Sequence, residues 1–264
     1  MNNLTTRSIS GLVYAIIFIS AILFSAESYI ALISIFSTIC IFEFSKILQS
    51  KNSIPYILLA LSIYVSIIKI SLTINNLLIA ICFIGLLSLL YYLISSKVIK
   101  TATSIQKIFL HIIYLILPFY FLIKLPFINN NYHPNIIIYI IVIIWTNDSF
   151  AFITGKKFGK HKLFESVSPK KTIEGFIGGL LFAILAGFFI GIYSTYFSIV
   201  NWMIIAIIVG IFGSLGDLVE SKFKRQANVK DSGKIMPGHG GLLDRLDSLF
   251  FLAPFVYLFI HYII

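Results

Sequence analysis

Nine apolar segments, each close to the length of a membrane crossing, leave little of this chain for anything else. We predict them at residues 9–25, 28–45, 54–73, 77–95, 108–128, 135–155, 174–195, 200–220 and 246–264. A helix needs about 20 mostly apolar residues to cross a bilayer. The chain is only 11% charged, whereas a soluble domain carries about 25% charged residues. The sequence therefore predicts an all-α integral membrane protein, a polytopic bundle of about nine transmembrane helices.

The basic residues favour one orientation of this bundle. With a cytoplasmic N-terminus, 18 of the 20 Lys and Arg residues lie in cytoplasmic segments. The other two, Lys69 and Lys124, lie near the outer ends of spans. Cytoplasmic loops of membrane proteins are enriched in Lys and Arg. We therefore expect two large basic loops, 156–173 and 221–245, on the cytoplasmic face of the cell inner (plasma) membrane, with the C-terminus outside.

The formal net charge of +10 could also indicate a nucleic-acid-binding protein. However, the basic residues are distributed between spans and form no separate basic domain. We therefore expect the lipid bilayer as a partner, and no nucleic acid. Cys40 and Cys82 both fall in apolar segments, which predicts small buried side chains and no disulfide.

The acidic residues divide the chain into two regions. Of ten acidic residues, only Glu27 and Glu43 come before Asp148, and the other eight follow from that position onward. This distribution predicts an N-terminal transmembrane scaffold at 1–130 and a catalytic transmembrane region at 131–264.

The first polar segment of the catalytic region begins inside a predicted span. An aspartate such as Asp148 costs about 2.5–3.5 kcal/mol at the centre of a membrane helix, so it is either functional or paired within the bundle. Further on, Thr172 is expected to cap the next helix, with Glu174 in its first turn. Lys170 and Lys171 would then lie at a helix N-terminus, where a phosphate binds favourably.

The helix that follows contains two pairs of glycines at GxxxG spacing, Gly175–Gly179 and Gly187–Gly191. Small residues at this spacing let helix backbones approach closely. We expect them to mediate close helix packing, within the chain or across a homodimer.

The most polar stretch of the chain precedes the last span. Residues 222–248 contain six basic residues, three aspartates, one histidine and four glycines. Asp217 lies at the inner end of one span, with Glu220 three residues later, and Asp244 and Asp247 repeat this spacing at the next span. Magnesium binds one or two carboxylates, keeps several waters and contacts substrate phosphate. We therefore predict a Mg²⁺ site formed by Asp217 and Asp244.

The same stretch has the residues expected around a polyphosphate. Five basic residues between the aspartates can offset phosphate charge: Lys222, Lys224, Arg225, Lys230 and Lys234. Residues 237–241, Pro-Gly-His-Gly-Gly, predict a tight turn with exposed backbone N–H groups, from which His239 can reach a ligand. Membrane topology requires only Lys and Arg, so the aspartates and the turn favour metal-assisted phosphoryl or nucleotidyl transfer at a membrane face.

These stretches resemble a known family. The segment SKFKRQANVKDSGKIMPGHGGLLDRLDS closely resembles the signature of the phosphatidate cytidylyltransferases, also called CDP-diglyceride synthases. Asp148-x-x-Ala151 with Gly155, FGKHKL and SPKKTxEGFIGG are also similar to that family. The resemblance covers roughly residues 140–264, and the first half is similar only in being hydrophobic.

Two small departures from the family pattern lie outside the expected chemistry. Phe152 is present where tyrosine is common, and Glu165 where proline is common. Neither residue belongs to the predicted site.

The resemblance implies that CTP and phosphatidic acid react to give CDP-diacylglycerol and pyrophosphate in phospholipid biosynthesis. It implies that Asp217 and Asp244 belong to a paired metal centre that includes Mg²⁺. Further catalytic residues are then Lys224, Arg225, Lys230, Asp231, His239 and Arg245. Residues expected to bind the substrates are Lys170, Lys171, Gly240, Gly241 and Asp148.

Three other readings of the sequence stay open. A CTP-dependent lipid kinase, such as a polyprenol kinase, would share the nucleotide and the membrane but transfer the γ-phosphoryl group. A transporter of an anionic solute would need charges along a path across the membrane, whereas here they gather at one face. A structural membrane protein would not need the aspartate-rich segment.

Overall fold

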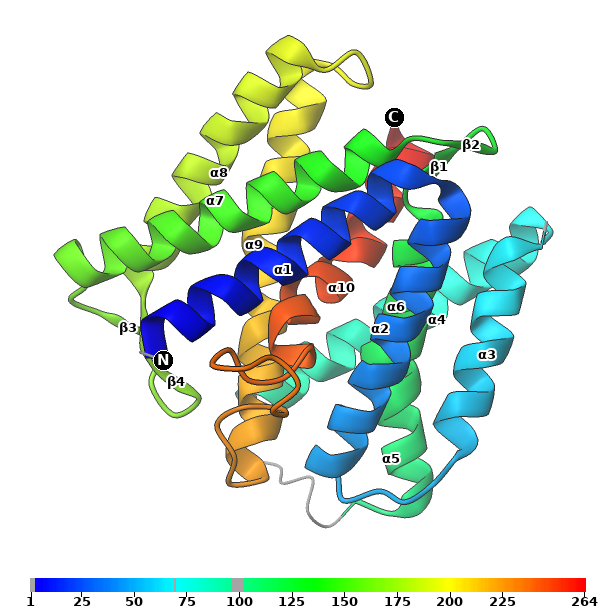
Figure 1. The fold of residues 1–264 in the computed structure, drawn as a ribbon, viewed down its shortest axis with the longest axis horizontal. Helices are drawn as coiled ribbons and strands as arrows, with labels where there is room; N and C mark the ends of the chain where they lie inside the picture. Colours follow the sequence, from blue (N-terminus) through cyan, green and yellow to red (C-terminus); the bar gives the residue numbers. More distant parts are fainter. Residues whose placement is uncertain (1–2, 69, 96–101) are drawn as a thin grey trace.

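The computed structural model describes residues 3–68, 70–95 and 102–264, and within these ranges the chain is a bundle of long helices (Figure 1). The helices are α1 (Asn3–Phe24), α2 (Ala26–Ile47), α3 (Ile54–Ile67), α4 (Leu72–Ile94), α5 (Ser104–His111), α6 (Leu117–Lys124), α7 (Pro134–Phe158), α8 (Ile173–Tyr193), α9 (Ile199–Gln226) and α10 (Leu243–Leu258). The strands are β1 (Phe127–Ile128), β2 (Asn131–Tyr132), β3 (Lys162–Phe164) and β4 (Ser168–Thr172).

The predicted all-α membrane fold is confirmed. Eight helical segments among the described residues are long and apolar enough to cross a membrane. One of them, Ser104–Lys124, joins α5 to α6 through a π-helical turn at Ile112–Ile116. The remaining predicted span, 54–73, corresponds to α3, an apolar helix of 14 residues, which is shorter than a full crossing.

Local sequence explains where many of these helices begin. The residue before the helix accepts a hydrogen bond from a backbone N–H of the first turn, as Ser and Thr commonly do. The residues that cap helices in this way are Ser25, Ser71, Thr103, Thr172 and Ser198. The predicted cap at Thr172 is therefore confirmed, with Glu174 in the first turn of α8.

Two short antiparallel hairpins interrupt the helical pattern. β1 and β2 are joined by Asn129 and Asn130, which both have positive φ, as a two-residue hairpin turn requires. β3 and β4 pair within the first basic loop, and the sequence analysis did not predict these strands.

The two basic segments lie at the same end of the bundle, as predicted. Figure 1 shows the start of α1, the β3–β4 hairpin and the α9–α10 connection towards one end. The β1–β2 hairpin, the α8–α9 connection and the C-terminus lie towards the other. Of the lysines used in the topology prediction, Lys69, Lys97 and Lys100 lie outside the described residues.

The second basic loop is shorter than predicted. Because α9 runs to Gln226 and α10 starts at Leu243, the connection covers 227–242 rather than 221–245. The part of α9 beyond the predicted span, residues 221–226, is stabilised by the side chain of Lys222. Lys222 Nζ donates to the carbonyl oxygens of Tyr92, Leu93 and Ser95 near the end of α4. Lys222 therefore points away from the predicted phosphate site.

The glycines of α8 allow close packing within the chain. A Cβ atom on Gly179 would lie 2.7 Å from the carbonyl oxygen of Asn147 in α7. A Cβ atom on Gly187 would lie 2.7 Å from the carbonyl oxygen of Trp202 in α9. The predicted close packing is confirmed between α7, α8 and α9, so these glycines give no argument for a homodimer.

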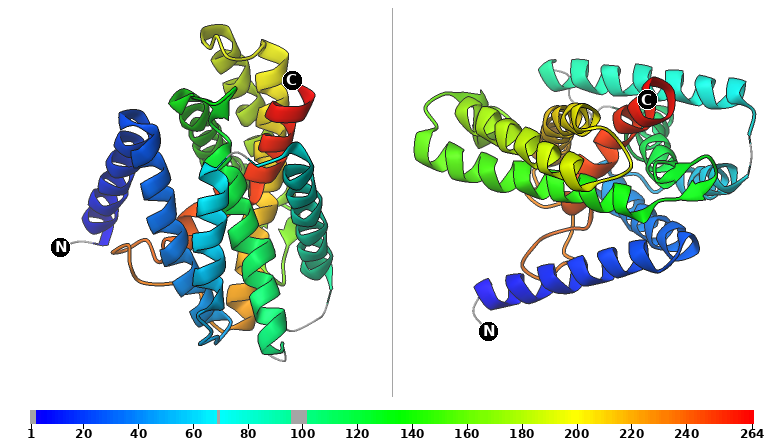
Figure 2. Two further views of the ribbon diagram at one scale, coloured as in Figure 1. Left: turned by 90° about the vertical axis from the view of Figure 1, so that its right-hand side faces the viewer. Right: turned by 90° about the horizontal axis from the view of Figure 1, so that it is seen from above.

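Helix α1 lies at the edge of the bundle. It packs against α2 and α7 and has many exposed apolar side chains, and Figure 2 shows it set apart from the other helices over much of its length.

The two cysteines, Cys40 and Cys82, are buried and free, as predicted.

Candidate active site

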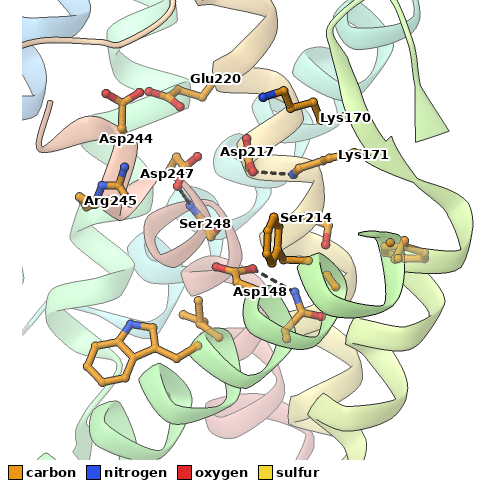
Figure 3. A pocket seen from close by; sticks show the side chains of 18 of the residues that line it. Asp148, Lys170, Lys171, Ser214, Asp217, Glu220, Asp244, Arg245, Asp247 and Ser248 are labelled. Atoms are coloured by element: carbon orange, nitrogen blue, oxygen red, sulfur yellow. Dashed lines mark hydrogen bonds and ion pairs between the residues drawn. The ribbon is translucent and has the colours of Figure 1, made fainter. Parts of the chain in front are cut away.

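A cavity of about 980 Å³ is lined by residues of α1, β3, β4, α7, α8, α9, α10 and the α9–α10 connection (Figure 3). Its wall includes nine of the predicted site residues: Asp148, Lys170, Lys171, Asp217, Lys224, Asp231, His239, Asp244 and Arg245. Four others do not line it: Arg225, Lys230, Gly240 and Gly241. The structure thus brings together most of the side chains that were selected from separate sequence motifs.

Three carboxylates from α9 and α10 meet in this cavity. One oxygen atom each of Asp217, Glu220 and Asp247 lies within 4.8 Å of the other two. Glu220 and Asp247 are buried, with 1% and 7% of their surfaces exposed. The helices approach closely because residue 216 is glycine: a Cβ there would lie 2.6 Å from Cβ of Phe251. We call these three residues the acidic triad.

Two lysines offset the negative charge around the triad. Lys171 Nζ lies 2.5 Å from Asp217 Oδ2, an ion pair drawn in Figure 3. Lys224 Nζ lies 2.6 Å from Glu220 Oε2 and 2.5 Å from Asp244 Oδ1. Because carboxylates this close repel one another, such partners stabilise the charged forms.

Asp244 lies beside the triad and not within it. Its Oδ1 accepts from Lys224, and its Oδ2 accepts from the backbone N–H groups of Ser232 and Gly241 at 2.9 and 2.8 Å. The sequence analysis selected Asp217 and Asp244 as metal ligands. The spacing of Glu220 and Asp247 was visible in the sequence, but the closeness of α9 and α10 was not.

The acidic triad fits a hard divalent cation. Glu220 Oε1 is buried and has no hydrogen-bond partner, which is costly unless another group neutralises it. Three oxygen ligands of carboxylate type suit Mg²⁺ better than zinc, which favours nitrogen and sulfur. Within the part of the chain that the structure describes, this is the one cluster of at least three acidic, His or Cys side chains with such spacing.

Residues 236–240 form the predicted tight turn. The Met236 N–H donates to the Gly240 carbonyl at 2.9 Å, and Gly238 and Gly240 have φ values of +74° and +94°. However, the prediction of exposed backbone N–H groups is wrong for His239, Gly240 and Gly241. The first two donate to the Met236 carbonyl and the third to Asp244, because the turn folds back on itself.

His239 is held against α1. Its Nδ1 lies 2.8 Å from Ser10 Oγ, and a Cβ on Gly11 would lie 3.2 Å from its ring. Burial lowers the pKa of His239, and the positive charges of Arg245 and Arg7 lower it further. The histidine therefore favours its neutral form.

The other predicted basic residues have different surroundings. Arg225 donates to the carbonyl oxygens of Val167 and Val229 at 3.3 and 3.4 Å and thereby ties the β3–β4 hairpin to the α9–α10 connection. Arg245 donates to the His239 carbonyl at 2.8 Å. Lys230 is exposed.

The lysines predicted at a helix N-terminus lie just outside it. Lys170 and Lys171 belong to β4 and precede the Thr172 cap. Both line the cavity.

The sequence analysis missed the contribution of the N-terminal region. Gly11 and Tyr14 of α1 form part of the cavity wall. Glu43 of α2 binds the α9–α10 connection. The only sequence signal was that Glu43 is one of two acidic residues before Asp148.

Fold and site together define a class: a polytopic helical membrane protein with an acidic, lysine-flanked cavity suited to metal-dependent chemistry on phosphate groups.

The chain belongs to the cytidylyltransferase family, whose sequence model matches residues 5–263. It is 34% identical to the phosphatidate cytidylyltransferase of Bacillus subtilis (strain 168) over 265 residues, 97% of each chain. It is 49% identical over 120 residues to the phosphatidate cytidylyltransferases of Staphylococcus saprophyticus and Staphylococcus aureus (strain COL), 45% of this chain and 46% of theirs. The similarity thus extends into the N-terminal half, beyond the 140–264 region where the motifs lie.

Proposed function

We propose that this protein is a phosphatidate cytidylyltransferase, which converts CTP and phosphatidic acid into CDP-diacylglycerol and pyrophosphate. Similarity to the Bacillus subtilis enzyme over 97% of both chains supports this function. The observation that carries it is the meeting of the acidic triad with Lys171 and Lys224 in one cavity of a membrane protein. Carboxylates and cations of this kind serve the transfer of a phosphate-bearing group.

In the proposed reaction, an oxygen of the lipid phosphate attacks the α-phosphorus of CTP and forms a new P–O bond. The bond from that phosphorus to the oxygen bridging to the β-phosphorus breaks, and pyrophosphate leaves with the electron pair. Because phosphatidic acid supplies its own nucleophile, no covalent enzyme intermediate is needed. The protein acts by positioning and by electrostatic stabilisation.

The acidic triad would hold Mg²⁺, and Asp217 is common to the triad and to the pair chosen from the sequence. When bound, Mg²⁺ polarises phosphate oxygens and neutralises the charge that develops on the leaving group. The second cation implied by the family resemblance would occupy the same carboxylate-rich region, which includes Asp244.

Basic residues around the cavity would bind the substrate phosphates. Lys171 and Lys224 already contact carboxylates of the site, and Lys170 and Arg245 line the same cavity. We assign the lipid phosphate to Lys170 and Lys171, and the triphosphate to Lys224 and Arg245.

The α7 wall of the cavity suits a substrate with an apolar tail. Trp145 and Phe152 line the cavity and are 44% and 70% exposed. Asp148 lies on the same helix, so a charged headgroup and an acyl chain would meet α7 at neighbouring positions. We place the cavity on the cytoplasmic face of the cell membrane, where CTP is available.

The first experiment incubates purified protein in detergent with Mg²⁺, phosphatidic acid and CTP labelled in the cytosine ring. We expect the label to enter the organic phase and pyrophosphate to be released. CDP in the aqueous phase, with a newly phosphorylated lipid when lipid alcohols are offered, would indicate the kinase instead. If folded protein forms neither product, both activities are excluded and the transporter becomes the favoured alternative.

A further inference from the structure

Glu43 is a buried acid outside the cavity. It lies on α2, in the N-terminal region, and only 1% of its surface is exposed. It does not line the cavity that contains the acidic triad. A buried carboxylate is costly unless hydrogen bonds compensate for the lost water, so its partners indicate why it is there.

Its observed hydrogen-bond partners lie in the α9–α10 connection and at the first residue of α10. Glu43 Oε1 accepts from the Leu242 N–H at 3.2 Å, and Oε2 accepts from the Leu243 N–H at 2.8 Å. Ser232 Oγ lies 2.9 Å from Oε2. Hydrogen bonds to a charged acceptor are stronger than those between neutral groups. One side chain of α2 thus holds both the connection and the first backbone N–H groups of α10.

The connection is shaped to receive this carboxylate. A Cβ on Gly233 would lie 2.2 Å from Glu43 Oε1, and a Cβ on Gly241 would lie 2.5 Å from Oε2. Any other residue at these two positions would displace the carboxylate or the backbone around it. Gly233 and Gly241 therefore make room for the contact between the connection and Glu43 of α2.

Glu43 is coupled to Asp244 through shared partners. Ser232 Oγ lies 2.9 Å from Glu43 and 3.0 Å from Asp244 Oδ2. Gly241, which packs on Glu43, donates its N–H to the same Asp244 oxygen. Asp244 in turn binds Lys224, which binds Glu220 of the acidic triad.

We propose that Glu43 is a positioning residue, which fixes the 227–242 connection and the start of α10 and thereby sets Asp244 and Asp247 against α9. This inference rests on the proposed cytidylyl transfer for its activity readout. It makes α2 a functional part of the site, although Glu43 lies outside the cavity itself.

The test compares Glu43→Gln with Ser45→Ala in the full-length protein in detergent. Glutamine keeps the size but places an N–H₂ group against backbone N–H donors. Ser45 lies on the same helix, is buried, and bonds His111 Nε2 at 2.9 Å, away from the connection. It therefore reports the effect of losing a buried hydrogen bond on α2 alone.

For Glu43→Gln we expect kcat to fall about 10- to 100-fold, since a displacement near 1 Å costs this much in catalysis. We also expect a higher Mg²⁺ concentration for half-maximal activity. Mg²⁺ binding is measured separately from activity, as the rise in unfolding temperature on adding Mg²⁺. This rise should be smaller in Glu43→Gln than in the wild type and unchanged in Ser45→Ala. Wild-type kcat and Mg²⁺ response in Glu43→Gln, or changes equal to those of Ser45→Ala, would overturn the inference.

If Glu43→Gln does not fold, Ser232→Ala provides the second test. It removes the hydroxyl shared by Glu43 and Asp244 and leaves both carboxylates in place. We expect smaller changes in kcat, in the Mg²⁺ concentration for half-maximal activity and in the Mg²⁺-induced rise in unfolding temperature. Unchanged values of all three in folded Ser232→Ala protein would overturn the coupling. Absence of CDP-diacylglycerol in the wild type would instead refute the proposed function, whereas the Mg²⁺-dependent unfolding shift would still test Glu43.

Discussion

Asp217, Asp244 and Asp247 carry the same side chain but lie in three different surroundings. Asp217 is paired with Lys171 and remains partly exposed to the cavity. Asp244 is held by Lys224 and by backbone N–H groups of the connection. Asp247 is buried near Asp217 and Glu220. The surroundings therefore distinguish the two aspartates of the acidic triad, Asp217 and Asp247, from Asp244, which organises the connection.

Replacing each aspartate by asparagine tests this distinction. We expect Asp217→Asn and Asp247→Asn to lower kcat at least about 100-fold and to abolish the Mg²⁺-induced rise in unfolding temperature, because each removes a charged ligand. Asp244→Asn should also lose activity but keep most of that rise. Loss of the Mg²⁺ response in Asp244→Asn alone would favour Asp244 as the ligand over the triad.

His239 should make stability depend on pH. Its folded-state pKa lies below the usual value of about 6.5, because of burial and the nearby Arg245 and Arg7. The unfolded chain therefore binds the proton more readily. This stabilising contribution is complete above about pH 6.5 and is lost as pH falls through the lower folded-state pKa.

We expect the unfolding temperature in detergent to fall between pH 7 and pH 5 by more in the wild type than in His239→Gln. Measuring both proteins across this range provides the check. Parallel curves would show that other groups account for the pH dependence.

At the scale of helices, the site depends on how closely α9 approaches α10. Gly216 and Gly213 lie one turn apart on α9, but a Cβ on Gly216 would meet Phe251 at 2.6 Å, whereas one on Gly213 would have 3.6 Å to its nearest neighbour. Gly216→Ala should therefore destabilise the protein by about 1–3 kcal/mol through overpacking. It should also lower activity, because the triad spans this contact.

Gly213→Ala is the matched control, with the same change in helix propensity and room for the added methyl group. Thermal unfolding and activity of both variants provide the measurements. Equal stability and activity in the two would show that the α9–α10 distance does not limit the site.

Features that depend on residues close together in the sequence could be predicted, whereas features that depend on contacts between distant residues could not. The apolar segments and the Thr172 cap could be predicted from the sequence because neighbouring residues determine them. The additional turn of α9 depends on Lys222 reaching the end of α4, about 130 positions earlier in the chain. The contact of Glu43 with Leu242 and Leu243 is similarly long-range, so no local pattern indicates it.

For the whole molecule, the arrangement in Figure 1 makes sidedness testable. The α9–α10 connection and the α8–α9 connection lie at opposite ends of the bundle, with Lys234 exposed in the first and Thr195 in the second. Both native cysteines are buried, so they give little background with a thiol reagent.

We therefore expect a membrane-impermeant thiol reagent to label Thr195→Cys in cells with an intact inner membrane. Lys234→Cys should be labelled only after that membrane is permeabilised, because the distribution of basic residues favours a cytoplasmic position for that end of the bundle. Labelling after permeabilisation serves as the control for reactivity of each cysteine. The reverse pattern would move the acidic cavity to the outer face, away from cytoplasmic CTP, and would contradict both the orientation and the proposed source of the nucleotide.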